Sequence, residues 1–99
     1  MRKIEQNMLT AIHNRRNWKE NNTCVEFSDH VGNPFMDATV YLHGNPIAYL
    51  LPDGSIEPDC DTLGEWPTPT TKSRLRALGV DLTQTKGKIY IDGEFICMV

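Results

Sequence analysis

Nucleophilic catalysis is the first chemistry to consider for this sequence, because cysteines and histidines both occur in it. Such catalysis needs a nucleophile, a base beside it and a third group that orients the base. The chain has three residues of each type: Cys24, Cys60, Cys97, His13, His30 and His43. They are scattered along the sequence, and no nucleophile elbow or comparable local motif surrounds any of them. Because cysteines in a small domain usually serve packing, we predict no enzymatic activity.

A metal site is the second chemistry to consider. Cys60 is flanked by Asp59 and Asp61, and a distant histidine, His43 or His30, could supply a nitrogen ligand. Zinc sites usually contain a close ligand pair such as CxxC or HxxxH, because a short loop or one helical turn then presents two ligands together. The sequence has no such pair and no glycine-rich phosphate loop. We therefore predict no metal and no cofactor, and we interpret this run as an acidic surface loop.

Basic side chains that could contact phosphates gather in two segments. The stretch TPTTKSRLRALGV, residues 68–80, carries three cations within five residues, and the N-terminal segment carries more. The candidates for binding are Arg2, Lys3, Arg15, Arg16, Lys72, Arg74 and Arg76. If both segments are helices on the same side of a sheet, their outer surface is a basic patch able to meet a nucleic acid. Charged outer faces are also common on purely structural helices, so the sequence leaves both interpretations open.

Charge is segregated along the chain, although the net charge is only −3. Residues 1–19 contain five Lys or Arg and one acid, residues 20–71 contain nine acids and no Lys or Arg, and residues 72–99 contain five bases and three acids. The small net negative charge predicts no general attraction to nucleic acid. The segregation is suited to steering a protein partner electrostatically.

Hydrophobic spacing predicts two helices. Residues 2–16 repeat apolar side chains at helical intervals from Ile4 to Ile12. A shorter helix over residues 70–78 has Thr70 or Thr71 as its N-cap and Gly79 just past its end. Leu75 and Leu78 of this helix are expected to face the core, and Trp18 is expected to cover the core after the first helix. Trp66, which precedes a proline, is left as either a core residue or an exposed one.

Strands are predicted between and after these helices. Period-two alternation indicates strands at Thr23–Phe27 and Ala38–Leu42, and an apolar run indicates a third at 47–51, with a turn at 43–46 between the last two. A short strand at 55–57 extends this meander, while residues 28–37 and the acidic residues 57–67 are expected to be connections. Asp92-Gly93 is suited to a two-residue hairpin turn that pairs Ile91 with Glu94, Tyr90 with Phe95 and Ile89 with Ile96.

The order α-β-β-β-α-β-β predicts an α+β domain, in which an antiparallel sheet of about five strands has helices packed on one face. A chain of 99 residues is expected to form a single domain over residues 1–99. No apolar run resembles a signal peptide or a membrane span, and three dispersed cysteines suit a reducing compartment. We expect an intracellular protein with no membrane partner.

Several motifs, taken in order, resemble a family of small proteins of tailed bacteriophages, particularly short-tailed T7-like ones. They are RKIEQNML.AI at the start, W…NNT.V at 18–25, VYLHGNPIA at 40–48 and WPTPTTKSRL.AL at 66–78. The resemblance implies action in the cytoplasm of an infected bacterium, where proteins of this size are often accessory factors that redirect a host protein or nucleic acid. It implies no catalytic residues, because the family is one without an established activity.

Two functional hypotheses follow from the sequence. The first is a non-enzymatic phage accessory protein that binds a host or phage protein, with Lys72, Arg74 and Arg76 and the turn containing His43 and Asn45 as its contact surfaces. The alternative is nucleic-acid binding by the basic helices 2–16 and 70–78. A homo-oligomer formed through sheet edges or helices is compatible with either hypothesis.

Overall fold

The computed structural model describes residues 2–28 and 36–98, and the prediction of a loop at 28–37 falls mostly on residues 29–35, outside this part. The elements in chain order are α1 (Lys3–His13), β1 (Trp18–Glu20), β2 (Thr23–Phe27), β3 (Ala38–Leu42), β4 (Asn45–Leu50), β5 (Ile56–Pro58), α2 (Cys60–Glu65), α3 (Pro69–Ala77), β6 (Leu82–Thr85), β7 (Lys88–Ile91) and β8 (Glu94–Met98). This is an α+β fold, as the sequence predicts.

The first five strands form an antiparallel meander in the order β1-β2-β3-β4-β5. The predicted bounds of β2 and β3 are confirmed. The turn between β3 and β4 is shorter than the predicted 43–46, because only His43 and Gly44 lie outside the strands, with φ of 53° and 81°. Such a turn matches the twist of its strands and lets β4 begin at Asn45. β1 was not predicted, because its three residues follow the helix too closely to show any alternation.

The helices differ from their predicted limits at particular caps. α1 ends at His13 rather than at residue 16, and Arg15 takes a φ of 53°. α3 begins earlier than predicted, because Thr68 is the N-cap in place of Thr70 or Thr71. The Oγ1 of Thr68 accepts a hydrogen bond from the Thr71 amide at 3.1 Å. Pro69 occupies the first helical position, where the backbone N–H that proline lacks would have no partner within the helix. Gly79, with φ 96°, follows the end of α3 as expected.

The acidic segment 57–67, which the sequence predicts to be a connection, contains the helix α2. The Asp59 side chain caps α2 by accepting a hydrogen bond from the Thr62 amide at 3.0 Å. Its other carboxylate oxygen accepts a hydrogen bond from the Tyr49 hydroxyl at 2.6 Å. This bond, followed by burial and the Asp59 charge, raises the pKa of Tyr49 to about 12. The start of α2 is therefore fixed to β4.

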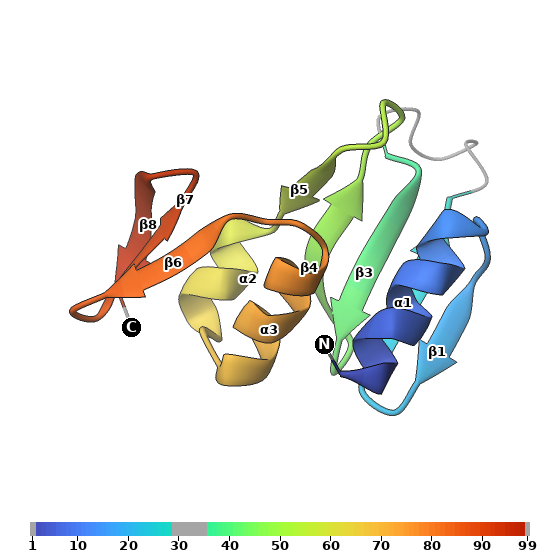
Figure 1. Cartoon of the computed structure of the whole chain (residues 1–99), viewed down its shortest axis with the longest axis horizontal. Coiled ribbons are helices and arrows are strands. Elements are labelled where there is room, and N and C mark those ends of the chain that lie inside the picture. The colour runs from blue at the N-terminus through green and yellow to red at the C-terminus, as the bar shows by residue number, and fades with distance from the viewer. Residues whose placement is uncertain (1, 29–35, 99) are drawn as a thin grey trace.

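The C-terminal hairpin belongs to a separate three-stranded sheet in the order β6-β7-β8 (Figure 1). Its Asp92-Gly93 turn and the pairs Ile91–Glu94 and Tyr90–Phe95 are confirmed. The predicted pairing of Ile89 with Ile96 is wrong, because a bulge shifts the register and Ile89 pairs with Cys97. Figure 1 shows this sheet at the end of the molecule away from α1, with α2 and α3 between it and the larger sheet. The small sheet therefore contacts the rest of the fold through packed side chains.

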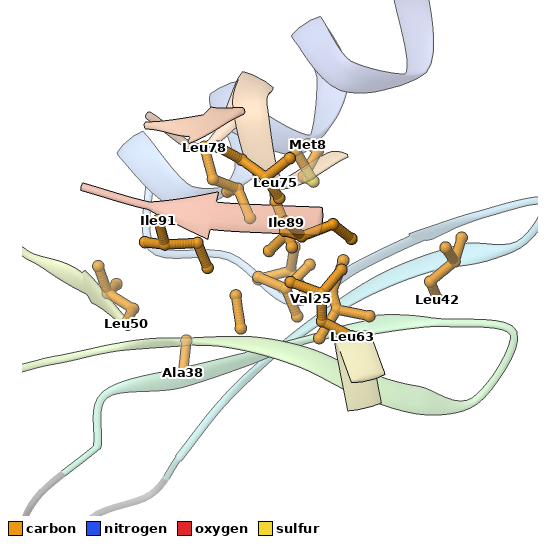
Figure 2. Close-up of a cluster of buried hydrophobic side chains, with 14 residues drawn as sticks. Met8, Val25, Ala38, Leu42, Leu50, Leu63, Leu75, Leu78, Ile89 and Ile91 are labelled. Atoms are coloured by element: carbon orange, nitrogen blue, oxygen red, sulfur yellow. The ribbon is translucent and has the colours of Figure 1, made fainter. Parts of the chain in front are cut away.

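Buried side chains of both sheets and all three helices form one cluster (Figure 2). Met8 of α1 and Leu75 of α3 lie above the sheet residue Val25, and Ile89 of β7 packs beside them. The helices thus cover one face of the five-stranded sheet. Trp18 packs against the cluster from β1, partly buried, so its predicted role as a cover for the core is confirmed. Within the part of the chain that the structure describes, no helix is long and apolar enough to cross a membrane.

Candidate interaction surfaces

Arg74, a predicted surface residue, is buried and bonded within the fold. Its side chain is 3% exposed, and its Nη1 donates to Glu5 Oε2 at 2.8 Å while its Nε donates to Thr23 Oγ1 at 3.0 Å. The Ser73 hydroxyl donates to the same Glu5 oxygen at 2.5 Å. This cluster joins α1, α3 and β2. Arg74 therefore does not belong to an exposed basic surface, and its placement there is corrected.

The helical spacing of the sequence is consistent with this burial. Arg74 lies three residues after Thr71 and four before Leu78, so it shares the buried stripe of α3. Glu5 lies three residues before Met8, on the buried stripe of α1. An acid and a base that each interrupt an apolar stripe need a partner of opposite charge when buried.

The buried pair gives folding stability a defined dependence on pH. Burial raises the pKa of Glu5, but hydrogen bonds from Ser73 and Arg74 outweigh it and hold the pKa below its ordinary value of 4.5. Because the folded-state pKa of Glu5 is lower than its unfolded-state pKa, the ionised carboxylate stabilises the fold at pH values above the unfolded-state pKa. This contribution is lost as the pH falls through the folded-state pKa. The difference in free energy of unfolding between the wild type and Glu5→Gln should therefore shrink as the pH falls below 4.5, measured by urea titration. A difference that stays constant over this range would contradict the pairing.

The remaining basic candidates lie on α1 and α3 or just beyond the two ends of α1. The two helices contact one another and lie side by side on the large sheet (Figure 1). Arg2, Lys3, Arg16 and Arg76 are exposed. Three of the side chains have partners within the fold. Arg15 forms an ion pair with Asp37 at 3.1 Å, and its guanidinium lies 5.1 Å from the centroid of the Phe27 ring. Lys72 donates a hydrogen bond to Gln84, and Arg76 Nε donates one to the Leu82 carbonyl at 3.0 Å. Both helices lie on one side of the large sheet, as the basic-patch hypothesis requires, but Arg2 and Lys3 stand at the start of α1 whereas Arg15 and Arg16 follow its end.

The other predicted contact residues, His43 and Asn45, lie beside Trp66 in a groove of about 180 Å³. We call it the Trp66 groove, and it is lined by Leu42, His43, Asn45, Ile47, Thr62, Trp66, Thr68 and Thr71. The apolar lining side chains Leu42 and Ile47 are buried, whereas Trp66 is 48% exposed. A large half-exposed aromatic side chain that shares a groove with buried apolar and exposed polar residues is typical of an interface anchor.

Local sequence explains how these residues meet. The tight turn at His43-Gly44 sets the start of β4, so Asn45 is held at that end of the sheet. Trp66 is the C-cap of α2, with its amide bonded to the Thr62 carbonyl at 2.8 Å. Pro67 and the Thr68 cap then redirect the chain into α3. The groove therefore forms where the β3–β4 turn meets the link between two helices.

Cys24 and Cys60 lie in environments unlike those of catalytic thiols. Partial burial, then the carboxylates of Asp59 and Asp61, raises the pKa of the Cys60 thiol. Burial, then the charge of Glu26, raises the pKa of Cys24. Reactive cysteines need the opposite, a lowered pKa beside positive charge. Among residues 2–28 and 36–98, no three His, Cys, Asp or Glu side chains gather as a metal site would require.

A family of phage proteins matches almost the whole chain. The model of the Kyanoviridae Gp96 protein family covers residues 1–98. The chain belongs to this family. The phage origin implied by the sequence motifs is therefore confirmed, but the Kyanoviridae are myoviruses of cyanobacteria, so the T7-like, short-tailed assignment is not supported. Neither the curated proteins nor the solved structures contain a match to this chain.

Proposed function

We propose that this phage protein is an accessory protein without catalytic activity, which binds a protein of the infected host or of the phage through the Trp66 groove. The observation that carries the proposal is that Trp66, 48% exposed, lines one groove together with the buried Leu42 and Ile47. Tryptophan is among the residues that most often dominate protein interfaces, because its large rigid ring gains much contact area at little entropic cost. The proposed place of action is the cytoplasm of the infected cyanobacterium.

The polar rim and nearby charges indicate the chemistry of the partner. His43 and Asn45 are available to hydrogen-bond a backbone or a side chain at the edge of the groove. Asp61 and Glu65, one helical turn apart on α2, are exposed, and Glu65 directly precedes Trp66. We therefore expect the partner to insert an apolar side chain beside Trp66 and to carry basic residues that face α2.

Affinity capture from infected cells tests the proposal. Tagged wild-type protein should retain one protein in stoichiometric amount, Trp66→Ala should lose it, and His13→Ala should keep it. His13 is the control because it is an exposed ring at the end of α1, outside the groove. Absence of a stoichiometric partner from the wild-type capture, or equal retention by Trp66→Ala, would contradict the proposal.

Nucleic-acid binding is the alternative, and one observation favours it. Both α1 and α3 lie wholly within the described residues, and neither carries an exposed carboxylate, since the Glu5 carboxylate is buried. A backbone of phosphates laid across these helices would meet Arg2, Lys3 and Arg76 without meeting an acid.

The alternative predicts a steep dependence on salt. Affinity for a mixed-sequence duplex should fall by about tenfold or more between about 50 and 200 mM salt, since each phosphate contact releases a counterion. Lys3→Glu should weaken binding, whereas Lys19→Glu, the same charge change on β1, should not. Fluorescence anisotropy measures both effects. An affinity indifferent to salt, or equal losses in the two variants, rules the alternative out.

A further inference from the structure

β8 is an edge strand: a bulge lies between its pairs with Ile89 and Tyr90, but none of the usual proline or basic residues blocks its outer side. It is hydrogen-bonded only to β7 in the β6-β7-β8 sheet, and no described residue outside that sheet makes a backbone hydrogen bond with it. Its sequence EFICM contains no proline, lysine or arginine. Edge strands of natural monomers often contain such residues, which hinder pairing, because an open row of backbone N–H and C=O groups pairs readily with another strand.

The same strand carries exposed apolar side chains. Phe95 is 54% exposed and Met98 is 64% exposed, which are the two highest values for large apolar residues in the described part of the chain. Phe95 also packs edge-to-face on Tyr90 of β7, with ring centroids 6.1 Å apart, so its ring is held in place at the surface. The opposite edge of this sheet, β6, exposes only the polar residues Thr83, Gln84 and Thr85. An apolar partner surface is therefore expected at β8 and not at β6.

Charge in this sheet is polarised along the strand direction. Asp81, Asp92 and Glu94 are all exposed at the end where β7 turns into β8, and the Asp92 amide bonds to the Asp81 carbonyl at 3.0 Å. Lys86 and Lys88 are exposed at the other end, where β6 turns into β7 and where Lys88 pairs with Met98. One end of β8 is thus acidic and the other basic.

The geometry points to a two-fold dimer of this chain, in which the β8 strands of two copies pair antiparallel and the two small sheets become one sheet of six strands. Antiparallel pairing brings the acidic end of one copy beside the basic end of the other, whereas parallel pairing would place like charges together. Glu94 of one copy then lies two strands away from Lys88 of the second copy. The two backbones are about 10 Å apart, a distance that the two long side chains can span. A second copy is the occupant because its charges complement those of β8 by symmetry.

This dimer uses residues distinct from those of the Trp66 groove, so it goes beyond the proposed function and can fail independently of it. Sedimentation equilibrium over a concentration series measures the dimer dissociation constant. The wild type should sediment as a dimer. Glu94→Lys and Lys88→Glu should each weaken the dimer by about tenfold or more, because each turns two attractive contacts into repulsive ones. Thr83→Lys, on the far edge strand β6, should leave it unchanged.

An equimolar mixture of the Glu94→Lys and Lys88→Glu variants gives the most direct test of the proposed dimer. In the mixed dimer both lysine–glutamate contacts are attractive again, so the mixture should recover the dimer that each variant alone has lost. Circular dichroism spectra that match the wild type show that the variants are folded. A monomeric wild type, single variants that dimerise normally, or a mixture that stays monomeric would each overturn the inference.

Discussion

Replacement of Glu5 by alanine should lower the free energy of unfolding by about 3–5 kcal/mol, the typical cost of removing one member of a buried ion pair. The reason is that Arg74, 3% exposed, keeps its charge but loses the carboxylate that lies 2.8 Å from its Nη1. For a chain of this size, such a loss is a large fraction of the total stability. Urea denaturation followed by circular dichroism measures it.

Two variants control this experiment. Gln6→Ala, at the exposed position next to Glu5 on α1, should change the free energy of unfolding by no more than about 0.5 kcal/mol. Glu5→Leu combined with Arg74→Met replaces both charges by apolar groups, so it should recover most of the loss. A Glu5→Ala variant as stable as Gln6→Ala would mean that the pair is not buried as described.

The buried pair also changes how mutations of the basic segment should be interpreted. An Arg74 substitution that abolishes binding would report partial unfolding, because its guanidinium joins Glu5 and Thr23. Lys3 and Arg76 are exposed and suit surface tests better. Charge reversal at Lys3 leaves the buried cluster intact.

Replacement of Trp66 by alanine should weaken the proposed protein complex by at least about 30-fold, equivalent to about 2 kcal/mol, as expected for an aromatic anchor at the centre of an interface. Since the indole is 48% exposed and ends a short helix, the free energy of unfolding should change by only about 1 kcal/mol. Isothermal titration calorimetry with the captured partner measures the affinity, and a urea titration measures the stability.

Graded substitutions make the Trp66 test sharper. Trp66→Phe keeps part of the ring area and should lose less affinity than alanine does. His43→Ala and Asn45→Ala, on the rim, should each cost about 1 kcal/mol or less, because rim contacts stay partly hydrated. Equal losses at the rim and at Trp66 would argue against a groove centred on the indole.

Elements with strong local patterns could be predicted from the sequence. Thr23–Phe27 and Ala38–Leu42 alternate cleanly, and Asp92-Gly93 specifies a turn whose two residues both have positive φ. α2 was missed because it has only six residues, one of them Gly64, so no helical repeat can develop. β6 was missed because Leu82 is its only buried residue, which leaves no alternation to detect.

The candidate surfaces depend on tertiary structure that local patterns do not encode. His43 and Asn45 could be selected as turn residues, but their meeting with Trp66 depends on α2 packing against β4, fixed by the Tyr49–Asp59 bond. The burial of Arg74 depends on Glu5, 69 residues away in the sequence. The composition of the segment predicts a basic patch, but Arg74 is buried in the folded protein and does not contribute to that surface.

Solute quenching tests most directly whether a protein partner covers Trp66, as we propose. The chain has two tryptophans, so Trp18→Phe leaves Trp66 as the single indole, and incorporation of hydroxytryptophan separates its emission from that of the partner. Iodide should quench the free protein strongly, because the indole is half exposed. Addition of the captured partner to saturation should protect the emission from iodide. Quenching that is unchanged at saturation would contradict the claim.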